Sequence, residues 1–233
     1  MNIVITGASS GFGKAIAKKF ALPGNQLWLC SRSDLKLYQA LEELMRDYPE
    51  AQIKARPFDL SRKEEAIAFG NWVLSNGVVA DVLVNNAGRF IPGSVELEED
   101  GVLEKMIETN LYSAYHLTRT LLPSMVKANQ GLIVNICSIA SMQAYRNGGA
   151  YSISKFALAG FSRNLREELK PKGIKVTAIY PGAAYTGSWE SSGIERARFM
   201  EAEDIASTIF ALTQLSPKAV VEDIVMRPQL GDI

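Results

Sequence analysis

The chain has 233 residues, with 25 lysines and arginines against 25 aspartates and glutamates, two cysteines and a single histidine. Balanced charge provides no basic field for nucleic acid or for an anionic membrane, and one histidine leaves no cluster for zinc, so we expect no metal. The chain enters an apolar strand directly and contains no run of eighteen apolar residues. These features predict a cytoplasmic protein with one domain, residues 1–233, in which Cys30 and Cys137 are buried, reduced thiols.

Short apolar runs rich in β-branched residues alternate with longer segments of helical periodicity. The expected strands are Ile3–Thr6, Gln26–Cys30, Gln52–Phe58, Asp81–Asn85, Gly131–Cys137, Ile174–Tyr180 and Ala219–Met226. The expected helices are Gly13–Leu22, Asp34–Asp47, Ser61–Ser75, Gly101–Ala128, Ala150–Lys170 and Glu203–Thr213. Several strands are apolar on nearly every residue, which is typical of parallel strands with helices on both faces. The alternation predicts an α/β fold: a Rossmann-like, doubly wound parallel sheet in a three-layer αβα sandwich.

Three local signals refine these elements. Ser61, followed by Glu64 and Glu65, is typical of a helix N-cap with acidic residues in the first turn. Pro123 should kink or end its helix, because proline lacks the N–H that the helix needs. The segment Pro181–Met200 has no clear periodicity and is rich in glycine and serine, so we interpret it as a substrate loop.

A glycine turn joins the first strand to the first helix, in the order Thr6-Gly7-Ala8-Ser9-Ser10-Gly11-Phe12-Gly13. Such a turn lets the backbone approach a pyrophosphate and aims the N–H groups of the helix at it. A tight turn without a ligand is the alternative, but the position at the first βα junction favours a dinucleotide. The candidate contacts are Gly7, Ser9, Ser10, Gly11, Phe12 and Gly13.

The end of the second strand indicates which dinucleotide binds. An acidic residue here would accept the ribose hydroxyl of NAD, whereas an arginine would pair with the 2′-phosphate of NADP. The chain has Ser31 and Arg32 at this position, so we expect NADP(H) as the cofactor, with NAD less favoured. Two alternatives remain open: Arg32 as a solvated surface charge, and Asp34 as the ribose ligand.

Tyr151 and Lys155 are four residues apart at the start of an expected helix, which places both side chains on one face. A neighbouring cation favours the phenolate, so Tyr151 is a candidate general acid or base near neutral pH. An isolated pair of this kind usually means a surface cation beside an aromatic ring. Here Ser138 follows another strand at the same sheet edge and offers a hydroxyl to a substrate oxygen.

Together these residues resemble the short-chain dehydrogenase/reductase family in its compact single-domain form. The family's T-G-x3-G-x-G matches Thr6, Gly7, Gly11 and Gly13, and its N-N-A-G matches Asn85, Asn86, Ala87 and Gly88. Its active-site Asn, Ser and Y-x3-K match Asn110, Ser138, Tyr151 and Lys155. Its P-G pair after the sixth strand, with a following threonine, matches Pro181, Gly182 and Thr186.

The resemblance implies a seven-stranded sheet in the order 3-2-1-4-5-6-7 and a cofactor across the switch point. It implies that Asp59 lies near the adenine and Asn86 near the adenosine ribose, and Leu60, Ala87 and Gly88 are further expected cofactor contacts. Tyr151 is then the proton donor and Ser138 holds the substrate oxygen. Lys155 bonds the nicotinamide ribose and lowers the tyrosine pKa, Asn110 anchors a relay water, and His116 has no catalytic role.

The expected activity is hydride transfer between NADP(H) and a carbonyl or alcohol substrate. The alternatives are a catalytically silent NADP-binding regulatory or partner protein, and a methyltransferase with a similar glycine turn. The residues expected around the substrate are Ala140, Met142, Tyr145, Ala184, Tyr185, Trp189, Ile194 and Phe199.

In related proteins two long helices pair across a two-fold axis, so we expect a homodimer or homotetramer. The residues expected in this contact are Phe156, Leu158, Phe161 and Leu165, and the ending Met226–Ile233 is a further candidate.

Overall fold

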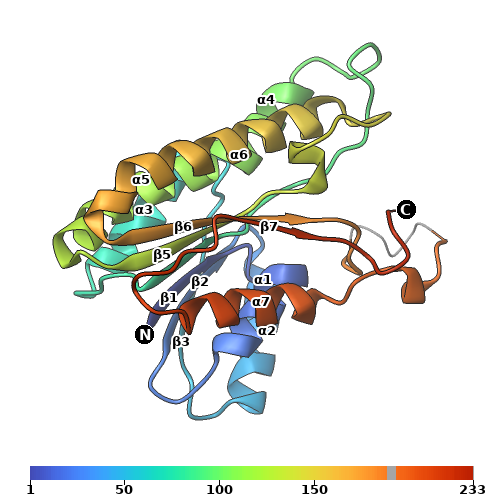
Figure 1. The fold of residues 1–233 in the computed structure, drawn as a ribbon. Helices are drawn as coiled ribbons and strands as arrows, with labels where there is room; N and C mark the ends of the chain where they lie inside the picture. The colour runs from blue at the N-terminus through green and yellow to red at the C-terminus, as the bar shows by residue number, and fades with distance from the viewer. Residues whose placement is uncertain (188–192, 233) are drawn as a thin grey trace.

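A computed structural model describes residues 1–187 and 193–232 of the chain (Figure 1). Its centre is one sheet of seven parallel strands in the order β3-β2-β1-β4-β5-β6-β7. The strands are β1 (Asn2–Thr6), β2 (Gln26–Ser31), β3 (Gln52–Pro57), β4 (Val82–Asn85), β5 (Gly131–Ile136), β6 (Ile174–Pro181) and β7 (Asp223–Met226). This order and direction confirm the predicted fold class and topology.

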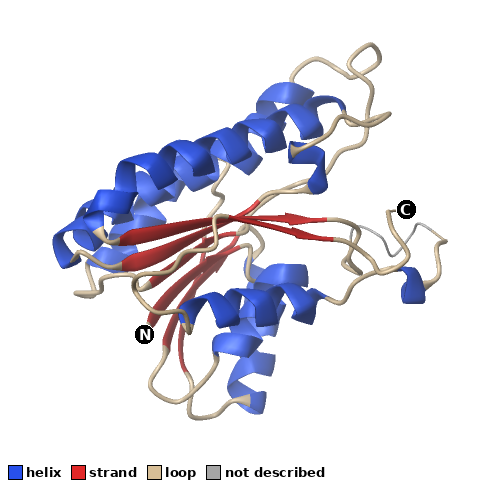
Figure 2. Cartoon of the chain, viewed as in Figure 1, coloured by secondary structure: helices blue, strands red, loops and turns tan. Residues whose placement is uncertain are grey.

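Helices cover both faces of the sheet (Figures 1 and 2). One face carries α1 (Gly11–Phe20), α2 (Asp34–Asp47) and α7 (Ala202–Thr213). The other carries α3 (Lys63–Leu74), α4 (Val102–Ile107), α5 (Ser113–Ala128) and α6 (Gly149–Leu169). The π-helical turn η1 (Glu108–Tyr112) joins α4 to α5, and short 3-10 turns are η2 (Ile139–Ser141), η3 (Lys170–Lys172) and η4 (Arg196–Arg198).

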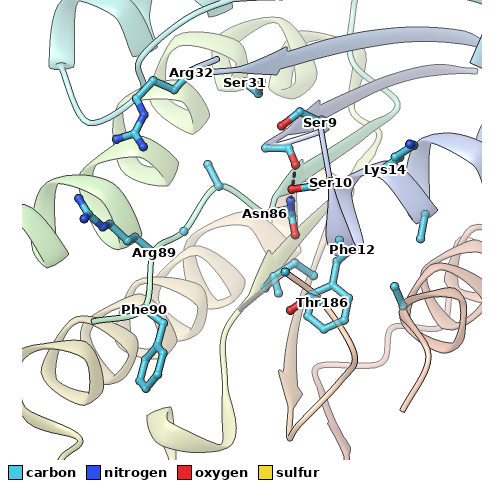
Figure 3. Close-up of a pocket in the computed structure, with 18 of the residues that line it drawn as sticks. Ser9, Ser10, Phe12, Lys14, Ser31, Arg32, Asn86, Arg89, Phe90 and Thr186 are labelled. Atoms are coloured by element: carbon cyan, nitrogen blue, oxygen red, sulfur yellow. Dashed lines mark hydrogen bonds between the residues drawn. The ribbon is translucent and has the colours of Figure 1, made fainter. Parts of the chain in front are cut away.

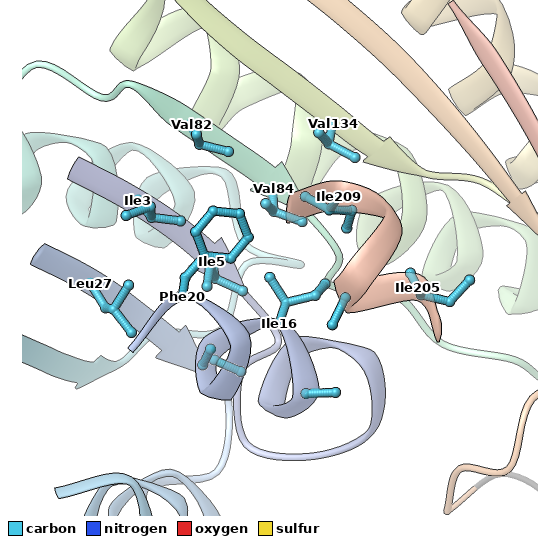
Figure 4. Packing of buried hydrophobic residues seen from close by; sticks show 14 of the residues in the cluster. Ile3, Ile5, Ile16, Phe20, Leu27, Val82, Val84, Val134, Ile205 and Ile209 are labelled. Carbon is cyan, nitrogen blue, oxygen red and sulfur yellow. The ribbon is translucent and has the colours of Figure 1, made fainter. Parts of the chain in front are cut away.

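Alternate residues of the inner strands supply two hydrophobic cores, one on each face. Ile3 and Ile5 of β1 pack with Ile16 of α1 and Ile209 of α7, as Figure 4 shows. Val4, between them in sequence, joins the opposite core with residues of α3, α5 and α6. Because side chains of a strand alternate between faces, helices on both sides require an apolar residue at every inner position. The continuous apolar runs in the sequence are thereby explained.

The last strand is shorter than expected, because β7 begins at Asp223 rather than Ala219. The Thr177 hydroxyl of β6 donates a hydrogen bond to the Val221 carbonyl at 2.6 Å, so a side chain replaces the regular ladder there. Beyond β7, the Gly182 N–H donates to the Met226 carbonyl at 2.7 Å, and a Cβ at Gly182 would lie 3.3 Å from both Pro228 and Asp232. The C-terminal segment therefore lies against its own chain at the end of β6.

The expectation that Ser61 caps its helix is wrong. Helix α3 begins at Lys63 with Arg62 at the N-cap position, and the Ser61 hydroxyl donates to Asp59 Oδ1 at 2.8 Å. The Glu65 carboxylate accepts a hydrogen bond from the Asp59 N–H at 2.6 Å and pairs with Arg62 at 3.2 Å. An acidic residue of the first turn thus stabilises the helix start, while Ser61 orients Asp59.

Of the two expected effects of Pro123, a kink or an end of the helix, the second is wrong, because α5 continues from Ser113 through Pro123 to Ala128. Pro123 lies on the exposed side of the helix. The carbonyl of Arg119, which loses its helical N–H partner, lies four residues earlier at another exposed position, where water can satisfy it. The packing of Leu117, Leu121 and Met125 into the core holds the helix together across this site.

Replacing Pro123 by alanine should therefore stabilise the protein. Alanine restores the backbone N–H and removes the clash of the proline ring with the carbonyl four residues earlier. Because alanine also gives the unfolded chain more conformational freedom, the net gain in the free energy of unfolding should be about 2 kcal/mol. The measurement is the free energy of urea unfolding, with exposed Lys127→Ala in the same helix as the control. A Pro123→Ala protein no more stable than this control would contradict the explanation.

Candidate active site

A cleft of about 1070 Å³ opens at the carboxyl ends of the central strands (Figure 3). Its walls come from the β1–α1 turn, the ends of β2, β4 and β5, the start of α6 and the segment after β6. Figure 3 shows Arg32 and Arg89 reaching into one end of the cleft, with Phe12 and Thr186 toward the other. The cleft therefore lies at the edge of the sheet where ligands of doubly wound folds bind.

The glycine turn forms one wall of the cleft, and glycine is required at its positions for different physical reasons. Gly7 and Gly11 have φ angles of 65° and 50°, which favour glycine. A Cβ at Gly13 would lie 2.2 Å from the Gly7 carbonyl oxygen, so this glycine permits close packing within the turn. Ser10 is the N-cap of α1, and the N-terminus of this ten-residue helix meets the cleft. Backbone N–H groups and the helix dipole there suit a pyrophosphate.

A set of hydrogen bonds ties the glycine turn to the end of β4. The Thr6 hydroxyl oxygen accepts from the N–H groups of Asn86 and Ala87 at 2.9 and 2.8 Å. The Asn86 side-chain amide donates to the carbonyl oxygens of Thr6 and Gly7 at 2.8 and 3.2 Å. The N-N-A-G segment therefore fixes the shape of the turn, and Asn86 lines the cleft with its amide already engaged.

The end of β2 presents positive charge to the cleft. Arg32 and Lys36 both line it, and neither takes part in an ion pair within the described residues. The Ser31 hydroxyl donates to the Ser33 carbonyl at 3.1 Å, while Ser33 caps α2. Asp34 is absent from the lining and accepts from the Leu35 N–H. The geometry thus favours Arg32 over Asp34 as the residue that meets a ligand here.

Helix α6 carries Tyr151 and Lys155 on its cleft side. Lys155 is 5% exposed, and its ammonium donates to the Ile136 carbonyl at the end of β5 at 2.8 Å and lies 5.9 Å from the Tyr151 ring centroid. The phenol hydroxyl of Tyr151 is hydrogen-bonded to the Ser138 side chain. The phenol and the ammonium therefore lie together in the lining of the cleft, with Ser138 next to the phenol just outside it.

Burial is the main cause of the pKa shifts of Tyr151 and Lys155. It raises the pKa of Tyr151 to about 12, against the lowering effect of the Ser138 hydrogen bond, and it lowers the pKa of Lys155 to about 8. Lys155, whose ammonium donates to the Ile136 carbonyl, is not among the groups that shift the tyrosine pKa, so the expectation that Lys155 lowers this pKa is wrong. Tyr151 is protonated at neutral pH, which is the state that a proton donor needs.

Asn110 lies fully buried in the π-helical turn η1. Its Oδ1 accepts from the Arg89 N–H at 2.7 Å, and its Nδ2 donates to the Arg89 carbonyl at 3.0 Å and to Ser154 Oγ at 2.8 Å. These contacts use both amide hydrogens, so the side chain positions the segment after β4 against α6. Any relay water at this residue would have to be held by its main chain.

Most of the predicted cofactor residues line the cleft. These are Gly7, Ser9, Ser10, Gly11, Phe12, Ser31, Arg32, Asp59, Leu60, Asn86, Ala87, Gly88, Tyr151, Lys155 and Thr186. Five predicted site residues lie outside the lining: Gly13, Asn110, Ser138, Pro181 and Gly182. Pro181 is buried as the last residue of β6, and Gly182 faces the C-terminal segment.

Sequence reasoning missed several lining residues, among them Lys36, Arg89, Phe90, Thr109 and Arg196. Arg89 and Phe90 follow N-N-A-G directly at a strand end, and this position could have indicated them. In the expected substrate loop, the Tyr185 ring contacts two side chains. Its centroid lies 5.8 Å from the Phe199 ring centroid and 4.8 Å from the guanidinium carbon of Arg196. Trp189, expected to line the substrate site, lies outside the described residues.

The apolar residues of α6 serve the core more than a surface. Leu158 and Leu165, expected in a subunit contact, are buried at 1% and 6% exposure, whereas Phe156 is exposed. The prediction for the two leucines is wrong because they pack against the sheet.

The remaining sequence predictions concern His116, the two cysteines and membrane-spanning segments. His116, for which we expect no catalytic role, packs against the rings of Tyr112 and Tyr115. Cys30 and Cys137 are buried, free thiols, as predicted. No helix in the described part of the chain is both long and apolar enough to cross a membrane.

A nicotinamide dinucleotide fits this cleft on three observations. The φ angles of Gly7 and Gly11 give a turn without side chains where the phosphates would lie. Arg32 and Lys36 are unpaired cations within the described residues at the adenosine end. Gly88 brings the wall of the cleft close to the buried Lys155 ammonium, which lies 3.5 Å from the position that a Cβ of this glycine would take.

Comparison with known proteins agrees with this geometry. A family model described as short chain dehydrogenase matches residues 1–196. An uncharacterized oxidoreductase of Staphylococcus aureus is 30% identical over 227 residues, which are 97% of this chain and 96% of that protein.

Solved structures show the same similarity. An alcohol dehydrogenase of the archaeon Thermococcus sibiricus, complexed with 5-hydroxy-NADP, has a TM-score of 0.89 at 27% identity, covering 100% of this chain and 98% of that chain. A 3-oxoacyl-(acyl-carrier protein) reductase of Brucella melitensis with bound NAD has a TM-score of 0.84 at 26% identity, covering 97% of this chain and 89% of that chain. The fold and the matched residues define a Rossmann-like oxidoreductase. The chain belongs to the short-chain dehydrogenase family.

Removing the buried ammonium should change stability in a pH-dependent way. Between pH 8 and 10.5 folded wild-type protein has released the Lys155 proton while the unfolded chain still holds it, so wild-type stability rises with pH there. The stability of Lys155→Met relative to wild type should therefore fall by about 3 kcal/mol across this range. Urea unfolding at several pH values measures it.

The exposed substitution Lys172→Met is the control for the loss of a lysine as such. Tyr151, which is present in both proteins, cancels from the comparison. A difference between Lys155→Met and wild type that is independent of pH would show that this ammonium is not buried.

Proposed function

We propose that the protein is an NADPH-dependent carbonyl reductase, which acts reversibly as an alcohol dehydrogenase. One observation carries the proposal: the partly buried Tyr151 phenol, hydrogen-bonded to Ser138, lies beside the buried Lys155 ammonium in the cleft that the glycine turn borders. This is an acid site for a substrate oxygen next to a dinucleotide site. A silent binding protein would have no need for a buried ammonium, whose desolvation is costly.

Ser138, Tyr151 and Lys155 have different roles in the proposed carbonyl reduction. When bound, NADPH supplies a hydride to the carbonyl carbon. The Ser138 hydroxyl donates a hydrogen bond to the carbonyl oxygen, and Tyr151 transfers its phenolic proton to that oxygen as the alcohol forms. The Lys155 ammonium lies 5.9 Å from the Tyr151 ring centroid, and its pKa of about 8 suits it to return a proton to the tyrosine near neutral pH.

NADPH is proposed over NADH because of charge at the adenosine end. Arg32 is exposed in the cleft, Lys36 lies in the first turn of α2, and the acidic Asp34 does not line the cleft. A guanidinium pairs with a phosphate in a two-pronged geometry, and a second cation strengthens the field around it. Known structures of similar fold bind NADP in one case and NAD in another, so the choice depends on these side chains.

Replacing Tyr151 by phenylalanine should abolish carbonyl reduction, with kcat falling roughly a hundredfold or more, because the proton donor is lost. NADPH affinity should stay within about threefold, since the ring and Lys155 remain. Steady-state NADPH oxidation over a panel of ketones and aldehydes measures the first, and NADPH fluorescence titration the second. Retained activity would contradict the assignment, and a wild type that binds NADPH but reduces no carbonyl would favour the silent binding protein.

Replacing Arg32 by alanine should weaken NADPH binding by roughly tenfold to a hundredfold, because a charge-assisted hydrogen bond to phosphate is lost. Binding of NADH, which lacks that phosphate, should change little. Fluorescence titration with both cofactors gives the two dissociation constants. The control is Arg46→Ala, an exposed arginine of the same helix region that does not line the cleft. Equal losses for NADH and NADPH would contradict the phosphate assignment.

A further inference from the structure

The segment Arg89–Glu98 follows the end of β4, and its first two residues, Arg89 and Phe90, line the cleft. Phe90 contacts the proposed proton donor, Tyr151. The rings of Phe90 and Tyr151 meet edge to face, with centroids 4.8 Å apart and an interplanar angle of 80°. Phe90 lines the cleft and is 40% exposed, so part of its ring faces the open space (Figure 3). An exposed aromatic face beside the proton donor is a surface that a bound substrate would cover.

Both ends of this segment are held in place by hydrogen bonds. Asn110 binds the N–H and the carbonyl of Arg89, and the Gly93 N–H donates to the Asn147 carbonyl at 3.2 Å. The Glu98 carboxylate accepts from the Ala150 N–H at 2.8 Å, at the start of the helix that carries Tyr151. A Cβ at Gly149 would lie 2.0 Å from this carboxylate, so glycine lets the two segments meet. Phe90 is therefore a fixed wall.

The surroundings of Tyr151 on this side are apolar and aromatic. Ile91 packs on the cluster formed by Val102, Met106 and Ala150. Tyr145 is close enough to Tyr151 to raise its pKa electrostatically, and its own ring is 43% exposed. Of the charged side chains of the segment, Glu98 is used at the helix start, and Arg89 lines the cleft but points away from Phe90, toward the end where Arg32 lies (Figure 3). A flat apolar group next to the reacting carbonyl matches these rings.

We propose that Phe90 determines substrate specificity by packing against an aromatic ring attached to the reacting carbonyl, so that aryl ketones and aryl aldehydes are the preferred substrate class. This inference rests on the proposed reductase function and names its substrate. The carbonyl oxygen lies at Tyr151 and Ser138, and the aryl group covers the exposed face of Phe90. Specificity then comes from a segment outside the loop 181–200.

The test compares Phe90→Ala and Phe90→Leu with wild type on acetophenone and butan-2-one. Loss of a ring contact and of its buried area should raise KM for acetophenone about tenfold in the alanine variant, with leucine intermediate. For butan-2-one KM should change less than about threefold, because no ring is present to lose the contact. Leu97→Ala, an 80% exposed residue of the same segment outside the cleft, is the matched control and should match wild type.

Further readouts separate specificity from a structural role. NADPH affinity and the pH profile of kcat should be the same in all variants, because Tyr151 keeps its hydroxyl and its Ser138 partner. Equal losses on both ketones, or a shifted pH profile, would contradict the inference and make Phe90 a positioning residue for Tyr151. A wild type with equal kcat/KM on both ketones would contradict it and leave the reductase proposal intact. A wild type that binds NADPH and reduces neither ketone would overturn both.

Discussion

The buried ammonium of Lys155 is the constraint on which the rest of the site depends. A charge without water needs a partner, and it has the Ile136 carbonyl at the end of β5, at 2.8 Å. Because this carbonyl belongs to a central strand, the contact fixes the rotation of α6 relative to the sheet. Tyr151, one helical turn earlier, then faces the cleft beside Ser138, which follows the same strand. The burial of the Lys155 ammonium is costly for folding, and it fixes the position of the Tyr151 phenol.

The same strand edge assembles the other parts of the cleft. Hydrogen bonds from Thr6 and Asn86 join the glycine turn to the end of β4, and Asn110 joins the continuation of β4 to α6. The π-helical turn that carries Asn110 sits between α4 and α5, where an extra residue redirects the side chain inward. Each contact links elements far apart in sequence, so the site exists only when the whole sheet is formed. The glycine turn, Tyr151 and Phe90 are therefore positioned by the same edge of the sheet.

The periodicity of the sequence predicted nearly all strands and helices, because apolar residues on both faces of the inner strands leave a continuous signal. Spacing placed Tyr151 with Lys155, and strand ends placed the glycine turn with Arg32. What failed depends on tertiary context. Pro123 is tolerated because it lies on an exposed face. Leu158 and Leu165 serve the core. The tyrosine pKa follows from burial and from where Lys155 points, and the contact of Phe90 with Tyr151 needs two segments sixty residues apart in sequence.

The central claim is that α6 presents a buried ammonium beside a protonated phenol, and the pKa of Lys155 tests it most directly. NMR titration of protein labelled with ¹³C at the lysine Cε atoms, with the Lys155 resonance assigned from the spectrum of the Lys155→Met variant, measures this value. We expect a transition near pH 8, as burial requires. A transition at the ordinary lysine value of 10.5 would place the ammonium in water and contradict the arrangement on which the proposed chemistry depends.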